Sequence, residues 1–312
     1  MNNKYILAIT TFQRKNRIKL LLDSFANFSS YKDHFTIIIA DDGSTDGTIE
    51  FLENLKISGI PIHLIKNNRQ GIHHQFNTIV NELEKMDFDY CFKCDDDIEF
   101  IQLGWESDYI NAIKNSGYDH LCHFDTKWRP IKNLKKPIIQ DNLISYCEAK
   151  DVQGAFFTLT PAVIHKVGYM DTQSFGFRGV GHVDYTMRAC RAGFNDIKNP
   201  FDVKDSDQYI THQSENYVSA LNKHVQNALE SDLETQRKYA LIQDQSRIYI
   251  PFYKQVTSLS SDEERELLLK RLDILETEKT WYEKTYGHQP RWFIRIGKIL
   301  NIISSIFLKS EK

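Results

Sequence analysis

Carboxylates stand side by side at two places in the sequence, each time directly after a short apolar run. They are Asp41 and Asp42 in IIADDGSTDGT, and Asp95, Asp96 and Asp97 in KCDDDIEF. Adjacent like charges repel one another, and a turn or a helix cap needs only one such side chain. The crowding becomes favourable when a cation or several hydrogen-bond donors lie among the carboxylates. A turn or a cap explains any single aspartate, whereas the whole pattern predicts a binding site.

The chemistry expected at such a site is the binding of a divalent cation. Asp95 and Asp97 are two residues apart and point to the same side if their strand continues. Their oxygen atoms suit Mg²⁺ or Mn²⁺, cations that also bridge the phosphates of a diphosphate. Thr10 and Thr11 end a third apolar run and add hydroxyl groups. We therefore expect the three runs to lie in one sheet, with their ends at the same edge.

A parallel sheet flanked by helices would position these side chains. The expected strands are 5–9, 36–40, 62–66 and 90–94, and the helical patterns between them cover 17–28, 48–56 and 72–85. This alternation is typical of βαβ units, whose ligands bind beyond the carboxyl ends of the strands. Further on, the sequence predicts helices at 105–115 and 183–192, the second closed by Gly193, and strands at 120–124 and 155–160. Ser44 or Thr45 is expected to cap the helix that begins near Thr48.

Length and composition limit the classes of protein to which the chain can belong. With 312 residues, 41% of them hydrophobic, it can form one large α/β domain with an appendage, or two domains. A net charge of −3 does not suggest a nucleic-acid partner. The sequence contains no signal peptide and no membrane-spanning run of about 18 apolar residues, so we expect a cytoplasmic protein. Cys91 and Cys94 are expected to be buried, reduced thiols rather than part of a zinc site.

The sequence changes character after about residue 215. Strand-like runs become rare, and 261–284 has an acidic helical pattern that begins with a capping box at Ser261 and Glu264. Residues 288–312 are predicted to form a basic amphipathic helix with a net charge of +4. Such a helix lies at an anionic membrane surface, or it docks onto the chain's own core or onto a second subunit of a homo-oligomer. The sequence leaves these alternatives open.

Five motifs resemble, in their order and spacing, those of family 2 glycosyltransferases of the GT-A fold. They are AITTFQR, IADDGSTDGT, NNRQGIHHQFN, KCDDDIEF and GHVDYTMRACRAGF, and the resemblance extends over about residues 4–215. The resemblance implies an α/β fold with a Rossmann-like, mostly parallel sheet. It places a GT-A domain at 1–215, with a nucleotide-sugar half at 1–100 and an acceptor half at 101–215, and a helical C-terminal region at 216–312.

By the same resemblance, the N-terminal half binds a nucleotide-sugar, expected to be UDP-linked. The expected donor-binding residues are Thr10, Thr11, Asp41, Asp42, Asn77, Asp95 and Asp96. Asp42 would hydrogen-bond the base together with Thr10, and Asp41 would hold the turn or reach the ribose. Asp97 is the expected metal ligand, with Asp95 near the ribose or the metal and His212 as a further ligand.

The chain departs from the family pattern at two places. The family often has Arg before Asn77, where this chain has Phe76, and the nearby His73 and His74 are either contacts of the diphosphate or surface histidines. The family's acidic base position falls on His182, and the next acidic residue is Asp184.

We expect Asp184 to act as the base, with His182 positioning the acceptor or sharing the proton. A histidine with a pKa near 6.5 is the better match to proton transfer at pH 7 and stays the alternative base. Phe175 and Arg178, in the Gly-rich segment that precedes these residues, are expected to line the acceptor side. Core packing is the competing explanation for Phe175.

These expectations describe a metal-dependent, inverting glycosyltransferase that uses Mn²⁺ or Mg²⁺. It would move a hexose or an N-acetylhexosamine to a saccharide or lipid-linked acceptor in bacterial surface-glycan synthesis. One alternative is a nucleotidyltransferase, although TTFQRKNR has basic residues and no glycine for a phosphate loop. The other alternative is a non-catalytic scaffold that binds sugar nucleotides.

Overall fold

The computed structural model describes residues 4–57, 59–126, 136–213 and 232–253. The chain divides into two units, residues 1–253 and 254–312, and every described residue belongs to the first. The predicted helix at 261–284 and the predicted basic helix at 288–312 therefore lie outside the described residues. None of the helices in the described ranges is long and apolar enough to cross a membrane.

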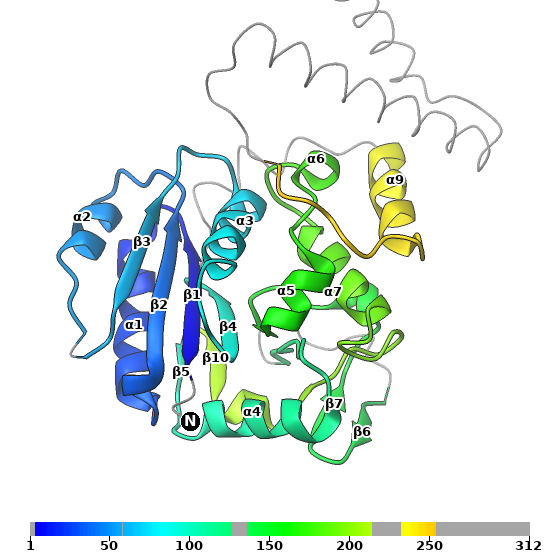
Figure 1. The fold of residues 1–312 in the computed structure, drawn as a ribbon, viewed down its shortest axis with the longest axis horizontal. Helices are drawn as coiled ribbons and strands as arrows, with labels where there is room; N and C mark the ends of the chain where they lie inside the picture. The colour runs from blue at the N-terminus through cyan, green and yellow to red at the C-terminus, as the bar shows by residue number, and fades with distance from the viewer. Residues whose placement is uncertain (1–3, 58, 127–135, 214–231, 254–312) are drawn as a thin grey trace, which may run out of the picture. The chain divides into compact units, whose positions relative to one another are not determined.

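A five-stranded sheet forms the centre of the first unit, in the order β3-β2-β1-β4-β8 (Figure 1). Its strands are β1 (Tyr5–Thr11), β2 (Phe35–Asp41), β3 (Ile62–Lys66), β4 (Tyr90–Asp95) and β8 (Phe156–Leu159). The first four are parallel to one another, and β8 runs antiparallel to β4. The predicted mostly parallel sheet is confirmed.

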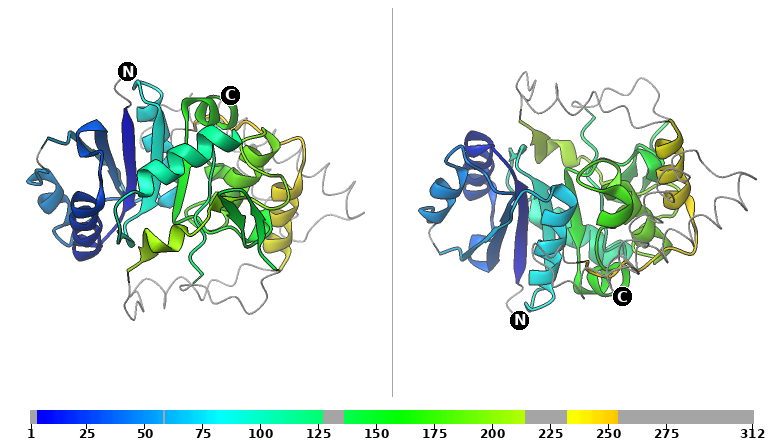
Figure 2. Two further views of the ribbon diagram at one scale, coloured as in Figure 1. Left: turned by 90° about the horizontal axis from the view of Figure 1, so that it is seen from below. Right: turned by 90° about the horizontal axis from the view of Figure 1, so that it is seen from above.

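Helices cover both faces of this sheet, so its central strands are apolar on both sides. The α-helices of the described residues are α1 (Lys15–Phe28), α2 (Thr48–Glu53), α3 (Ile72–Leu83), α4 (Trp105–Ser116), α5 (Pro161–Val167), α6 (Thr172–Phe175), α7 (Gly181–Arg191) and α9 (Asp232–Gln243). Leu7 and Ile9 of β1 pack in one cluster with residues of α1 and α4. Ile6 and Ala8 pack in a second cluster with residues of α3, α5 and α7. Figure 2 shows α1 and α3 on opposite sides of β1.

Two small sheets and three short 3₁₀ helices complete the described fold. The elements are β5 (Ile98–Phe100) paired with β10 (Ile210–His212), the sheet of β6 (Ile138–Gln140), β7 (Leu143–Ser145) and β9 (Asp202–Val203), and η1 (Lys32–His34), η2 (Ala149–Asp151) and η3 (Ser206–Gln208). The pairing of β5 with β10 is the one that matters for the site, because it places His212 opposite Ile98, directly after the three aspartates.

Two local predictions are wrong. Residues 120–124 form no strand and make only an isolated bridge at Cys122, because their backbone N–H groups donate to three different segments rather than to one neighbouring strand. Neither Ser44 nor Thr45 caps α2. The N-cap position is Gly47, and Asp46, one residue earlier, accepts a hydrogen bond at its Oδ1 from the backbone N–H of Thr48 at 3.1 Å.

The predicted boundary at residue 215 falls inside the first unit, because residues 232–253 fold against it. Ile250 donates its N–H to the carbonyl of Val167 and accepts the N–H of Tyr169. The side chain of Ile242 is buried beside Phe175. The unit that carries the sheet therefore extends to residue 253.

Candidate active site

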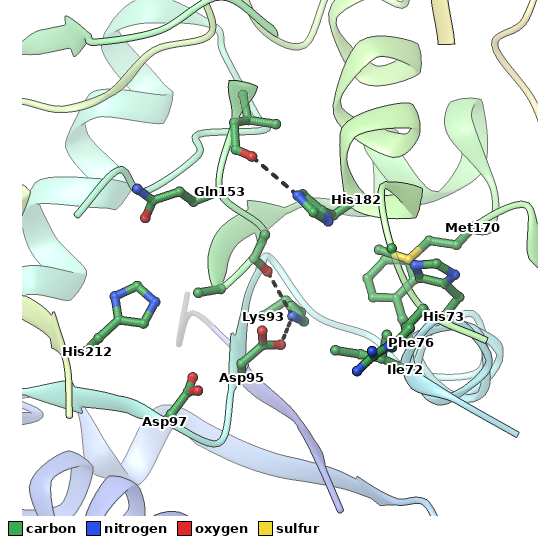
Figure 3. Close-up of a pocket in the computed structure, with 15 residues that line it drawn as sticks. Ile72, His73, Phe76, Lys93, Asp95, Asp97, Gln153, Met170, His182 and His212 are labelled. Carbon is green, nitrogen blue, oxygen red and sulfur yellow. Dashed lines mark hydrogen bonds and ion pairs between the residues drawn. The ribbon is translucent and has the colours of Figure 1, made fainter. Parts of the chain in front are cut away.

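A cavity of about 750 Å³ lies at the carboxyl end of β4 (Figure 3). Its polar wall carries Lys93, Asp95, Asp97, Gln153 and His212 on one side, and His73, Arg178 and His182 on the other. Its remaining lining residues are Ile72, Phe76, Val152, Gly154, Ala155, Met170 and Gly179. A volume of this size is in the range of small-molecule sites.

Asp95 faces this cavity as part of an ion pair with Lys93. The lysine belongs to β4 and is buried, and its ammonium group bonds Asp95 Oδ1 and donates to the carbonyl oxygen of Gly154 at 3.0 Å. Thr10 Oγ1 donates to the same carboxylate oxygen at 3.1 Å. The pairing of β1 with β4 puts Thr10 directly opposite Asp95, so the sheet itself supplies this contact.

Asp96 and Asp97 share the guanidinium group of Arg14. Arg14 Nη1 lies 2.6 Å from Asp96 Oδ1 and 3.1 Å from Asp97 Oδ2. Asp96 is buried and also accepts a hydrogen bond from Thr11 Oγ1 at 2.7 Å. Burial raises the pKa of Asp96 to about 6, an effect that Arg14 opposes. Asp97, by contrast, is 27% exposed and lines the cavity.

The donor set around the cavity suits a divalent cation in its chemistry. Asp95, Asp97 and His212 offer two carboxylates and an imidazole, and Mn²⁺ accepts both kinds of ligand. In the described part of the chain, however, no three such side chains gather closely enough to hold a metal ion. Each carboxylate lies instead against a cationic side chain, Lys93 or Arg14.

Asp41 and Asp42, the first pair of carboxylates, are fully buried and organise two loops. Asp41 accepts hydrogen bonds from the N–H groups of Gly43 and Ser44 and from Ser44 Oγ, so it holds the turn after β2. Asp42 accepts hydrogen bonds from the N–H groups of Gln70 and Gly71, at 2.6 and 2.9 Å. These bonds fix the loop between β3 and α3.

Arg69 adds a guanidinium group to Asp42. Its Nη1 lies 2.7 Å from Asp42 Oδ2, and its Cζ lies 3.6 Å from the centre of the Phe12 ring and 4.4 Å from that of Phe177. A planar cation thus lies over two aromatic faces with its edge on a carboxylate. Gly71, with φ of +91°, follows in the same loop, and a Cβ there would lie 2.2 Å from the carbonyl oxygen of Phe177. Glycine is therefore required where the two loops meet.

His182 projects from the first turn of α7 into the cavity. A Cβ at Gly154 would lie 2.5 Å from the His182 ring, so the missing side chain is what lets the ring lie against this segment. Nε2 of His182 lies 3.3 Å from the carbonyl oxygen of Val152. Burial lowers the pKa of His182 to about 4, and the neighbouring His73 acts in the same direction. The imidazole is therefore neutral at pH 7.

Comparisons with known proteins identify the family to which this site belongs. Residues 6–159 match the family model described as glycosyl transferase family 2. An uncharacterized glycosyltransferase of Acanthamoeba polyphaga mimivirus is 24% identical over 209 residues, which cover 65% of this chain and 79% of the relative. The chain carries a family 2 glycosyltransferase domain.

Solved structures of similar fold show that this family 2 glycosyltransferase has the GT-A architecture. Residues 1–349 of TarS from S. aureus, in complex with UDP, match 77% of this chain and 64% of that chain, with a TM-score of 0.52 and 14% identity. The mannosyltransferase PcManGT from Pyrobaculum calidifontis, in complex with GDP-Man and Mn²⁺, matches 69% and 58%, with a TM-score of 0.50 and 13% identity. The chain spans less than two thirds of either structure, and at these identities the likeness shows the fold alone.

The cavity of the glycosyltransferase brings together some of the residues predicted for its site and not others. The lining residues among them are Asp95, Asp97, Arg178, His182 and His212. The predicted residues that do not line it are Thr10, Thr11, Asp41, Asp42, Asn77, Asp96, Phe175 and Asp184. Thr10 nevertheless donates to the lining Asp95, while Thr11 and Arg14 both donate to Asp96.

Asn77 and Phe175 have structural roles, which corrects their predicted assignment. Asn77 is fully buried and exchanges two hydrogen bonds with the backbone of Met170, at 2.9 and 2.8 Å, which ties α3 to the segment before α6. Phe175 is buried against Val183 and Ile242. Both side chains are buried outside the lining of the cavity.

Asp184, the predicted base of this glycosyltransferase, does not line the cavity. It is fully buried on α7, where Arg188 Nε donates to its Oδ2 at 2.8 Å and Arg247 Nη1 lies 3.1 Å from its Oδ1. Arg188 also donates to the carbonyl oxygens of Val167 and Tyr169. Both oxygens of this carboxylate lie against guanidinium groups, outside the lining of the cavity. We therefore correct its assignment from base to structural anchor.

Residues with contacts at the site that were not singled out from the sequence include Lys93, Arg14, Arg69, Asp125 and Gln153. Lys93 carried a signal, since a lysine inside an apolar strand two residues before Asp95 shares its side of the strand. The sequence also gave a signal for Arg14, which is a cationic residue just after the first strand. It gave no signal for Arg69 and Asp125, because their partners are distant in sequence. His73 and His74 are both buried, so their interpretation as surface histidines is wrong.

Replacing Asp184 with Asn should lower the stability of the glycosyltransferase by about 3 kcal/mol, because removing one partner leaves buried guanidinium charge uncompensated. The rate of donor hydrolysis per folded molecule should change little. Thermal unfolding and a hydrolysis assay measure the two effects, and Asp23→Asn, on the surface of α1, is the matched control. An unchanged melting temperature together with a rate about 100-fold lower would restore Asp184 as the base.

Proposed function

We propose that the protein transfers a sugar from a UDP-linked donor to a hydroxyl group of a saccharide or lipid-linked acceptor, with inversion at the anomeric carbon. The observation that carries this proposal is the shared cavity of Asp95, Asp97 and His182, which joins the sheet edge to the first turn of α7. The UDP complex of TarS supports a UDP-linked donor. A role in surface-glycan synthesis follows from the family resemblance and is the narrower part of the proposal.

We infer that a divalent cation takes part, with Asp97 and His212 as its protein ligands. The Mn²⁺ complex of the mannosyltransferase supports this inference. When bound, the cation stabilises negative charge on the departing diphosphate. Lys93 and Arg14 lie against the same row of carboxylates and lower its net negative charge. Arg178, on the opposite wall, adds a cationic side chain that can contact an anionic substrate.

His182 is the general base in this proposal. The carbonyl oxygen of Val152 only accepts hydrogen bonds, so Nε2 of the neutral ring carries the hydrogen and Nδ1 carries the lone pair. Nδ1 takes the proton of the acceptor hydroxyl while the acceptor oxygen attacks the anomeric carbon. The bond from that carbon to the diphosphate oxygen breaks, and UDP leaves with the bonding electrons.

The nucleobase of the donor is proposed to bind over the ring of Phe12, next to Asp42, where the Arg69 guanidinium group now lies. A heterocycle with an N–H group matches that guanidinium group in being planar and in donating to a carboxylate. The two backbone N–H groups on Asp42 would keep its charge partly satisfied while the arginine moves. Phe177, the second ring over Arg69, belongs to the segment that leads into α7.

Location and assembly stay proposals that rest on the sequence. We propose a cytoplasmic protein whose basic C-terminal helix lies at the inner face of the plasma membrane or on a second subunit. Residues 254–312 lie outside the described residues, so the geometry of the described chain does not bear on this choice. Sedimentation with anionic liposomes, before and after removal of 288–312, separates the two.

Replacing Asp97 with Ala should reduce Mn²⁺-stimulated hydrolysis of a UDP-sugar by about 100-fold or more, because the cation loses a carboxylate ligand. The fold should survive, since the side chain is partly exposed at the edge of the sheet. A screen of nucleotide-sugars with Mn²⁺ first identifies the donor, and Asp87→Ala, at a highly exposed position, is the control. Full activity of chelator-treated Asp97→Ala would exclude the metal assignment, and UDP binding without any hydrolysis would favour a non-catalytic scaffold.

Replacing His182 with Gln should lower the hydrolysis rate by about 100-fold while leaving the affinity for UDP unchanged. Titration of His182 should lower the wild-type rate only toward pH 4, because burial keeps the ring neutral above that pH, whereas Asp96, with its pKa raised to about 6, is expected to titrate at higher pH. Rates over pH 4–8, for wild type and Asp96→Asn, and calorimetric UDP titrations test both points. A limb near 6.5 that persists in Asp96→Asn, or an unchanged rate in His182→Gln, would contradict this assignment.

Replacing Phe12 with Leu should weaken UDP binding by about tenfold, because base stacking on an aromatic face contributes about 1–3 kcal/mol. Phe177→Leu, which removes the other ring over Arg69, is the matched comparison. Calorimetry with UDP and with free uridine measures the effect without turnover. Equal affinities of Phe12→Leu and wild type for uridine would rule out the proposed binding site of the nucleobase.

A further inference from the structure

Asp125 is a buried carboxylate that does not line the cavity, yet it contacts two residues that do, His212 and Gln153. We propose that Asp125 is a positioning residue of the active site, which fixes the ring of His212 and the side-chain amide of Gln153. The importance of these two side chains for substrate binding rests on the proposed function. The geometry itself does not depend on it.

The carboxylate of Asp125 holds His212 through two hydrogen bonds to one oxygen. Oδ2 lies 3.0 Å from the backbone N of His212 and 3.0 Å from its Nδ1. His212 is the last residue of β10, a strand of three residues that pairs only with β5 within the described chain. So short a ladder fixes the ring poorly by itself, and the two bonds from Asp125 supply the missing restraint.

The same contact selects the tautomer of His212. An ionised carboxylate only accepts hydrogen bonds, so Nδ1 of the neutral ring must carry the hydrogen. Nε2 then carries the lone pair and is the nitrogen that can accept a proton or bind a cation. Asp125 therefore determines which chemistry His212 offers at the cavity.

The main chain of Asp125 holds Gln153 in a reciprocal pair. Its N–H donates to Gln153 Oε1 at 3.1 Å, and its carbonyl oxygen accepts from Gln153 Nε2 at 3.2 Å. Gln153 precedes β8, whereas His212 ends β10, so one residue links two separate parts of the cavity wall. Replacing Asp125 with Ala removes both acceptor oxygens and so the contact with His212, and it leaves the backbone contact with Gln153 available.

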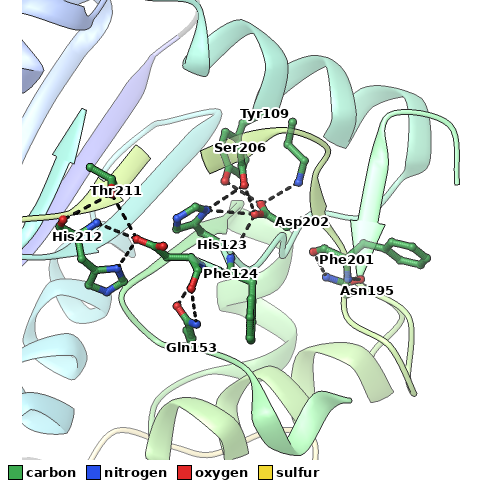
Figure 4. Close-up of polar contacts among 12 residues, drawn as sticks. Tyr109, His123, Phe124, Gln153, Asn195, Phe201, Asp202, Ser206, Thr211 and His212 are labelled. Atoms are coloured by element: carbon green, nitrogen blue, oxygen red, sulfur yellow. Dashed lines mark hydrogen bonds and ion pairs between the residues drawn. The ribbon is translucent and has the colours of Figure 1, made fainter. Parts of the chain in front are cut away.

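Asp202 lies close to Asp125 in the fold and provides a matched control. It is equally buried, and its carboxylate accepts from Tyr109 Oη at 2.7 Å and Ser206 Oγ at 2.5 Å, and lies 3.2 Å from His123 Nδ1. None of these partners lines the cavity. Figure 4 shows Asp202 among Tyr109, His123 and Ser206, whereas the partners of Asp125 include His212 and Gln153, which line the cavity.

The test compares Asp125→Ala with Asp202→Ala by thermal unfolding and by calorimetric binding of Mn²⁺ alone, of UDP with chelator and of UDP with Mn²⁺. Asp125→Ala should weaken binding of Mn²⁺, and of UDP in its presence, by about tenfold or more, while UDP binding in chelator stays unchanged. Asp202→Ala should lower the melting temperature without changing the affinities of the folded protein. Unchanged affinities in folded Asp125→Ala would overturn the proposal.

A measurement on the wild-type chain keeps the proposal testable if Asp125→Ala does not fold. Nitrogen-15 NMR of the histidine rings, with His212 assigned by comparison with His212→Gln, should show its hydrogen on Nδ1. A hydrogen on Nε2 would overturn the proposal. Since this readout needs no donor, it decides the role of Asp125 even for a protein that neither binds nor hydrolyses UDP-sugars, an outcome that would instead defeat the proposed function.

Discussion

The burial of carboxylates at the ends of β2 and β4 is the constraint on which the rest of the site depends. Asp41, Asp42 and Asp96 are almost completely enclosed by protein, and a buried charge is tolerated only when it is paired and hydrogen-bonded. The surrounding chain must therefore supply donors at fixed positions. Two loops and the parallel register of β1 with β4 are set by that requirement.

The hydrogen-bond donors to these carboxylates come from three different parts of the structure. The sheet supplies threonine hydroxyls, because Thr10 lies directly opposite Asp95 in the ladder. The loop before α3 supplies backbone N–H groups to Asp42. Cationic side chains complete the pairing, with Arg14 on two aspartates and Lys93 on a third. The wall that faces the cavity is therefore fixed before any substrate arrives, which is what preorganised binding requires.

In the half of the molecule that carries α7, the buried carboxylate of Asp184 is also paired with cationic side chains, but it anchors a segment of the chain instead of facing the cavity. The pairing of Asp184 with Arg188 and Arg247 uses the helix to anchor the segment around residue 250. With that face of α7 turned into the core, the residue two positions earlier is the one directed at the cavity. His182 is tolerated there because burial keeps its ring uncharged, whereas a carboxylate would need a cation beside it.

The sequence by itself determined the parallel sheet, most of its helices and the family, because apolar periodicity and contiguous motifs are local properties. It predicted Asp95 and Asp97 on one side if their strand continued; β4 ends instead at Asp95, and a turn at Asp96 and Asp97 brings Asp97 to the same cavity. Only the tertiary structure decided which acidic residues reach the cavity. Arg69 lies 27 residues from Asp42 and Asp125 lies 87 from His212, and no spacing rule predicts such pairs. A carboxylate becomes an anchor or a site residue according to the partner that folding brings to it.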